Sequence, residues 1–114
     1  MAIEVEVSTQ GGVTVVTVAG EIDGGSAPGL QARILSLLQQ DGSLILDLGG
    51  VTYMSSAGLR VLLLLYRQAV SRNGRVALAG VAETIKDTMA VTGFLKFFVV
   101  ADTVDQALTT LQQA

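Results

Sequence analysis

The 114-residue sequence contains no cysteine, no histidine and no tryptophan, and it has a single proline. Without Cys or His, the usual zinc ligands, a cysteine nucleophile and a Ser–His dyad are all excluded. A disulfide scaffold is excluded for the same reason. We therefore expect a protein that is not an enzyme and that holds no metal and no cofactor.

Charge and long apolar runs are also scarce. Seven basic and ten acidic residues give a formal net charge of −3, and Phe and Tyr together make up 4% of the chain. This acidic, aromatic-poor composition argues against nucleic-acid binding. The longest apolar run, Val61–Tyr66, is far shorter than the roughly 18 residues of a membrane span. The start, Met-Ala-Ile-Glu, has no basic residue of a signal peptide, so we expect a cytoplasmic protein without a membrane partner.

What the sequence does have is apolar material for one core. Half of its residues are hydrophobic, and a chain of this length buries roughly 60–65% of its unfolded surface. The length indicates one domain, over residues 1–114, without a linker or a repeat.

The apolar pattern predicts five strands and four helices. We expect the strands at 3–7, 13–18, 44–48, 76–79 and 97–100. We expect the helices after Ser26 through Leu38, at 56–72 before Asn73-Gly74, at 83–91, and after Asp102 or Thr103. The order ββαβαβαβα predicts a single α/β domain with a mixed, mainly parallel β-sheet faced by about four α-helices.

Two loops at the carboxyl ends of strands are the expected places for a site, Glu21–Gly25 and Gly49–Ser56. Ser55 or Ser56 can cap the helix that follows, and the same position stabilises a phosphate on a serine hydroxyl. Asp23 either bonds the backbone of its own loop or lies near Ser56. Asp47 is expected to end its strand and to bond loop amides.

The helix over 56–72 has one broad apolar arc, which is the expected core face: Leu59, Leu62, Leu63, Leu65, Tyr66, Ala69 and Val70. Ala57, Val61 and Leu64 fall within the opposite, polar arc. We expect these three side chains to be exposed. Flanked by Arg60 and Arg67, they form a candidate partner-binding strip, although isolated apolar residues are also ordinary on a protein surface.

The stretch 51–62, VTYMSSAGLRVL, resembles the signature of the STAS domain, in particular that of the bacterial anti-sigma factor antagonists. Residues 20–23, GEID, resemble that family's motif at the exit of the second strand. The separation of the two motifs and the order of the elements match along nearly the whole chain.

Aligned on Met54 and Gly58, the resemblance makes Ser56 the phosphoacceptor. Ser55 is the alternative, since it stands where the family often has aspartate, and Ala57 replaces the family's second serine. We also expect Asp23, Asp47, Thr52 and Gly58 to lie near the phosphoacceptor.

The resemblance implies a partner switch. In that family the unphosphorylated antagonist binds an anti-sigma factor that is also a serine kinase, and the sigma factor is released. The kinase phosphorylates the antagonist, and a PP2C-type phosphatase restores binding. We expect a monomer or a weak homodimer. The alternatives are a switch with a non-sigma target, a relative of the domain in anion transporters or stress-signalling assemblies, and a small enzyme or nucleotide-binding protein using Asp23 and Asp47.

Overall fold

The computed structural model describes residues 3–38 and 43–113. Its strands are β1 (Glu4–Gln10), β2 (Val13–Ile22), β3 (Leu44–Met54), β4 (Val76–Ala79) and β5 (Val99–Ala101). Its helices are α1 (Ala27–Leu35), α2 (Ser56–Ser71), α3 (Glu83–Thr92) and α4 (Val104–Gln112), with a 3-10 turn η1 at Leu95–Phe97. The predicted order of elements is confirmed.

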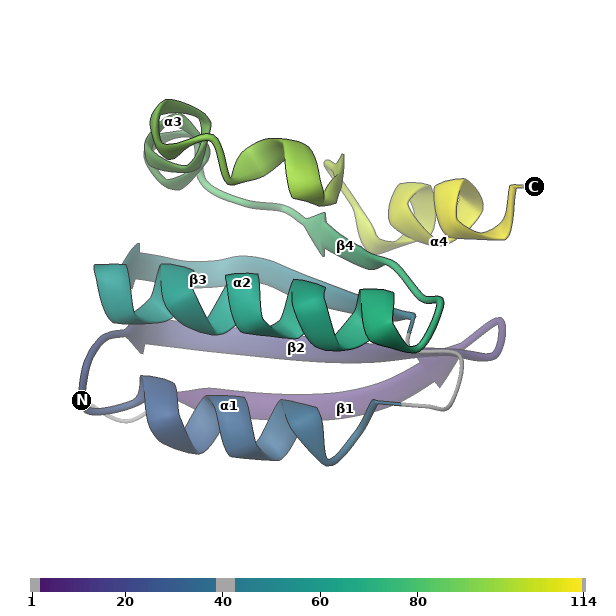
Figure 1. Cartoon of the computed structure of the whole chain (residues 1–114), viewed down its shortest axis with the longest axis horizontal. Helices are drawn as coiled ribbons and strands as arrows, with labels where there is room; N and C mark the ends of the chain where they lie inside the picture. Colours follow the sequence, from purple (N-terminus) through teal and green to yellow (C-terminus); the bar gives the residue numbers. More distant parts are fainter. Residues whose placement is uncertain (1–2, 39–42, 114) are drawn as a thin grey trace.

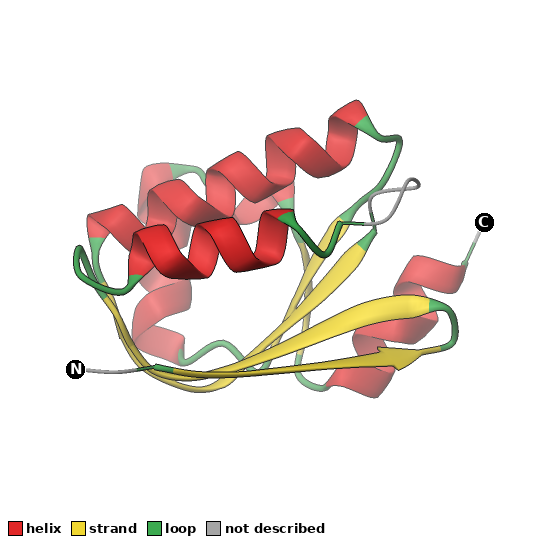
Figure 2. Cartoon of the chain, turned by 90° about the horizontal axis from the view of Figure 1, so that it is seen from below, coloured by secondary structure: helices red, strands yellow, loops and turns green. Residues whose placement is uncertain are grey.

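The strands form one sheet in the order β1-β2-β3-β4-β5. β1 is antiparallel to β2, and the other neighbouring pairs are parallel. The predicted mixed, mainly parallel sheet is therefore confirmed. Helices α1 and α2 run side by side over one face, whereas α4 lies on the other face (Figures 1 and 2). None of the helices in residues 3–38 and 43–113 is both long and apolar enough to cross a membrane.

Alternating side chains of the strands build a core on each face of the sheet. The larger core joins Val16, Val18 and Leu46 to the apolar sides of α1, α2 and α3. The smaller core joins Val15, Ile45 and Ala77 to Ala107 of α4. Because Val15 and Val16 face opposite ways, this single strand supports both layers.

Strand β3 is longer than predicted. The prediction of a loop at Gly49–Ser56 is wrong, because residues 49–54 belong to β3. The strand continues to Met54 because it stays paired with β2, from Thr14↔Leu44 to Ile22↔Met54. Two shifts in this register place extra residues in β3 as bulges, which conceal the strand's alternating pattern. Pairing of β3 with β4 ends earlier, at Asp47↔Ala79.

The chain leaves β4 through Gly80, which has a left-handed backbone (φ +69°). A Cβ atom at Gly80 would lie 3.2 Å from the Cα atom of Gly49. Both the conformation and the close approach therefore require glycine here.

The ends of other elements also differ from the prediction. β1 and β2 extend to Gln10 and Ile22, so the first two residues of the predicted loop at Glu21–Gly25 belong to β2. α1 ends at Leu35, although Leu37 and Leu38 still pack against the larger core. Residues 95–97 form a 3-10 turn instead of the start of a strand, and the Phe97 ring stacks on Tyr66 of α2 with centroids 4.9 Å apart. Of the two predicted caps of α4, Asp102 and Thr103, the second is confirmed, because the Thr103 hydroxyl accepts from the Gln106 N–H at 3.1 Å.

Candidate functional site

The ends of β2 and β3 lie side by side, and the first turn of α2 follows directly. Ile22 pairs with Met54 at the last position of both strands. One residue later, the Ser55 N–H donates a hydrogen bond to the Ile22 carbonyl oxygen at 2.8 Å. The segment after β2, which begins with Asp23, is therefore held beside the start of α2, as the two sequence motifs predict.

The two serines of the pair have different environments. Ser55 is the N-cap: its backbone is extended, its hydroxyl accepts from the Gly58 N–H at 3.4 Å, and its carbonyl accepts from the Leu59 N–H at 3.0 Å. Ser56 is the first helical residue and is exposed. Among the described residues no group forms a hydrogen bond with the Ser56 hydroxyl, so this oxygen is open to a reaction partner.

Gly58 allows the first turn of α2 to sit close to the sheet. A Cβ atom at this position would lie 2.6 Å from Cγ of Met54 and 2.9 Å from Cγ2 of Ile22. Both distances are shorter than a van der Waals contact, so a larger residue must displace the turn or its neighbours. The glycine of the motif therefore sets the position of Ser55 and Ser56 relative to the ends of the strands.

Asp23 makes local backbone bonds, as one of its two interpretations expects. Its Oδ1 atom accepts from the N–H groups of Gly25 at 2.9 Å and Ser26 at 3.0 Å. These hydrogen bonds, that from Ser26 first, hold the pKa of the Asp23 carboxyl below its usual value of 3.8. Since Asp23 directly follows Ile22, it also lies next to the α2 start, and the two interpretations are compatible.

Ser26 occupies the predicted N-cap position of α1, but its hydroxyl does not bond the helix. It donates instead to the Glu21 carbonyl oxygen at 2.9 Å and accepts from the Asp23 N–H at 3.0 Å. The segment 23–26 is thus a closed set of hydrogen bonds between β2 and α1.

Thr52 lies close to this site, whereas Asp47 does not. The Thr52 hydroxyl is 3.5 Å from the Gly20 carbonyl oxygen, and Thr52 lines a small pocket of about 170 Å³ together with Leu59 of α2. Asp47 precedes Met54 by seven positions of one strand, roughly 20 Å. It does accept from the Gly49 N–H at 3.1 Å, but it neither ends β3 nor adjoins Ser56.

The predicted exposure of the partner-binding strip is wrong for Val61. Val61 is only 4% exposed and belongs to the larger core, and Ala57 and Leu64 are half-buried. The helix buries a wider arc than expected because it packs against α1 as well as the sheet. Arg60 and Arg67 are exposed as predicted.

Val70, which was expected to face the core, is 49% exposed. It lies on the same side of α2 as Arg67 and Ser56, at about 100° per residue. The exposed side of α2, here called the α2 face, therefore consists of Ser56, Arg60, Arg67, Val70 and Ser71.

A family model described as the STAS domain matches residues 4–107. The chain belongs to the STAS domain family. The structure of an anti-sigma factor antagonist from Mycobacterium paratuberculosis superposes with a TM-score of 0.87 at 30% identity, over 98% of this chain and 96% of the other.

Two curated relatives extend this likeness within the STAS family. The anti-sigma-B factor antagonist of Bacillus subtilis is 32% identical over 93 residues, which cover 82% of this chain and 85% of the relative. The Bordetella bronchiseptica protein BtrV, named as a candidate anti-sigma factor antagonist, is 29% identical over 104 residues and 90% of both chains.

Alanine at Gly58 and alanine at Gly29 should have opposite effects, although both glycines are the third residue of their helix. G58A should lower the free energy of unfolding by about 1–3 kcal/mol, because its methyl group meets Met54 and Ile22. G29A should raise it by about 0.5–1 kcal/mol, since no atom lies within 4 Å of its Cβ position. Urea unfolding followed by circular dichroism measures both. Equal effects would show that Gly58 is not sterically required.

Replacing Asp23 with Asn should destabilise the protein in a pH-dependent way. The folded state lowers the pKa of Asp23, so the charged carboxylate stabilises the fold above the ordinary pKa of 3.8. That contribution is lost as the pH falls through the lower, folded pKa. The stability difference between wild type and D23N should therefore be largest near neutral pH and shrink under acid conditions. Urea unfolding of both proteins along a pH series tests this; a difference that is constant with pH would contradict it.

Proposed function

We propose that this STAS protein is an anti-sigma factor antagonist controlled by phosphorylation of Ser56. The observation that carries the proposal is the exposed, unbonded hydroxyl of Ser56 beside the cap residue Ser55. The named relatives support the class of function, since one is the anti-sigma-B factor antagonist of Bacillus subtilis and another is an anti-sigma factor antagonist from Mycobacterium paratuberculosis. Its role is regulatory binding rather than catalysis.

Ser56 is favoured over Ser55 as the acceptor because a phosphate there leaves the helix cap intact. The Ser55 hydroxyl already accepts from the Gly58 N–H, and phosphorylation of Ser55 would alter this cap. The first turn of α2 contains no acidic residue. A phosphate of about −1.5 to −2 charges on Ser56 is therefore compatible with the positive end of the helix.

The α2 face supplies a surface for the anti-sigma factor. Arg60 and Arg67 lie within about 40° of Ser56 around the helix axis, and the half-buried Ala57 and Leu64 border them. A protein partner that covers this face must desolvate Ser56. Adding a dianion there opposes binding through the cost of desolvation and through repulsion of acidic groups on the partner.

We assign phosphorylation to a serine kinase activity of the anti-sigma factor itself, and dephosphorylation to a PP2C-type phosphatase. In this cycle the unphosphorylated protein sequesters the anti-sigma factor and frees the sigma factor. The proposed compartment is the cytoplasm, where all of these partners act.

Aspartate at position 56 should weaken binding of the anti-sigma factor by about tenfold or more, because it places a negative charge at the binding face. S56A should bind as wild type does. T109D is the control, since it adds the same charge to an exposed residue of α4, on the opposite side of the sheet from the α2 face. Pull-down from a lysate of the native cell, followed by calorimetry with the captured partner, measures the affinities.

Incubation with the captured partner and ATP should add phosphate to wild type and S55A but not to S56A, as read by mass spectrometry. Incorporation at Ser55 alone, or equal binding by S56A and S56D, would contradict the assignment of Ser56. If the captured partner regulates no sigma factor, the proposed target is wrong, whereas the proposed control by phosphorylation of Ser56 still stands.

Charge reversal at Arg60 or Arg67 should separate binding from stability, and a Val61 variant should do the opposite. R60E and R67E should weaken partner binding severalfold with little change in stability, since both side chains are exposed. V61A should lower the free energy of unfolding by about 2 kcal/mol and leave affinity near the wild-type value, because Val61 is buried. Calorimetry and urea unfolding on the same preparations give both quantities. Unchanged affinity in R60E and R67E would show that the α2 face is not part of the interface with the partner.

A further inference from the structure

The outer edge of β1 is a long strand edge to which no strand of the described residues is paired. Among residues 3–38 and 43–113, β1 is hydrogen-bonded only to β2, so the other edge of its seven residues carries free backbone donors and acceptors. The opposite edge of the sheet is β5, which has only three residues. Short edge strands protect against further pairing, whereas a long one invites it.

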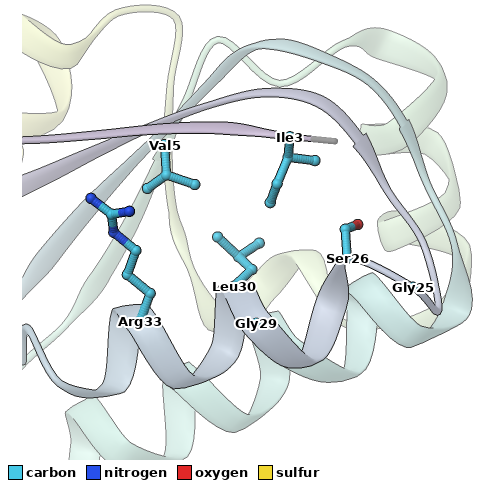
Figure 3. A pocket seen from close by; sticks show the side chains of 7 residues that line it. All are labelled: Ile3, Val5, Gly25, Ser26, Gly29, Leu30 and Arg33. Atoms are coloured by element: carbon cyan, nitrogen blue, oxygen red, sulfur yellow. The ribbon is translucent and has the colours of Figure 1, made fainter. Parts of the chain in front are cut away.

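A hollow lies beside this edge, between β1 and α1. Ile3 and Val5 face Leu30 and Arg33 across it, and Gly29 leaves the wall of α1 open (Figure 3). The hollow has a volume of about 380 Å³. Val7 continues the line of Ile3 and Val5 on the same face of the strand and is 40% exposed. The unpaired edge is thus bordered by apolar side chains that α1 leaves partly uncovered.

The charges on β1 restrict how two copies of the strand can pair about a two-fold axis. Glu4 and Glu6 are exposed on the other face. An antiparallel pair centred on residue 4, 5 or 6 places a glutamate directly opposite a glutamate, which is unfavourable. A pair centred on Val7 places Glu4 opposite Gln10 and Glu6 opposite Ser8, and it uses all seven residues.

We propose that two copies of this protein associate through antiparallel pairing of their β1 strands, centred on Val7. The two sheets then form one continuous sheet, with both α1 helices on the same side. Val7 of each copy contacts Val7 of the other, and the second copy covers the hollow at Ile3 and Val5. The amide of Gln10 and the hydroxyl of Ser8 can donate to the glutamates opposite them.

Charge at position 7 tests this geometry, because the two-fold axis places each residue 7 against itself. Wild type should show a concentration-dependent equilibrium between 11.8 kDa monomer and dimer in sedimentation equilibrium. V7D alone and V7K alone should each raise the dimer Kd by about tenfold or more, since like charges meet. An equimolar mixture of V7D and V7K should dimerise more tightly than either variant. Circular dichroism confirms that the variants are folded.

Cysteine pairs give an independent test, since the natural chain contains no cysteine. V7C should form a disulfide-linked dimer on mild oxidation. T9C is the matched control: it lies on the same face of β1, but in the proposed register the two residues are about 14 Å apart along the strands, beyond the reach of a disulfide.

Three results would overturn the proposal: wild type that stays monomeric at millimolar concentration, V7D with the wild-type Kd, or T9C that cross-links as fast as V7C. None of these results depends on phosphorylation, so they leave the proposed function of Ser56 unaffected.

Discussion

The seating of the first turn of α2 against the ends of β2 and β3 is the constraint on which the site depends. The hydrogen bond from Ser55 to the Ile22 carbonyl joins the helix to the sheet, and the absent side chain of Gly58 lets Ile22 and Met54 fill the space below. With the turn held there, Ser55 completes the cap and Ser56 points away from the core. One close approach of the backbone thereby assigns different roles to two adjacent serines.

The same seating explains how a modification could act on the surface without disturbing the fold. α2 is flanked by α1 on one side and by η1 on the other, where Tyr66 stacks on Phe97. Val61 lies on the flank opposite Tyr66 and is buried in the larger core, which also contains the apolar residues of α1. Only a narrow side of the helix remains in solvent. A phosphate on that side changes the charge of the surface that a partner contacts, while the apolar contacts that hold the helix stay in place.

The fold was predictable because apolar spacing identifies each element and the alternation of strands and helices limits the topology. The serine pair at the start of α2 and the neighbouring Asp23 segment were also predictable from the sequence, since both depend on local hydrogen bonds of the backbone. Two features could not be predicted in this way. Val61 is buried because α2 packs against α1 as well as the sheet, and a helical wheel of one segment does not contain that neighbour. The length of β3 depends on pairing with β2 across two bulges, one between Asp47 and Gly50 and one at Thr52, which interrupt the alternation that marks a strand.

Segment 23–26 lies between the α2 start and the hollow beside β1, since Asp23 adjoins Ile22 while Gly25 and Ser26 line the hollow. Asp23 and Ser26 hydrogen-bond each other, and the Ser26 hydroxyl donates to the Glu21 carbonyl oxygen, which leaves the segment few alternative conformations. Coupling between two surfaces requires an element with two arrangements that both surfaces bias. A segment closed by its own hydrogen bonds is a fixed spacer instead. Phosphorylation of Ser56 and pairing of β1 are therefore expected to operate independently, so that each protomer of a dimer keeps its own switch.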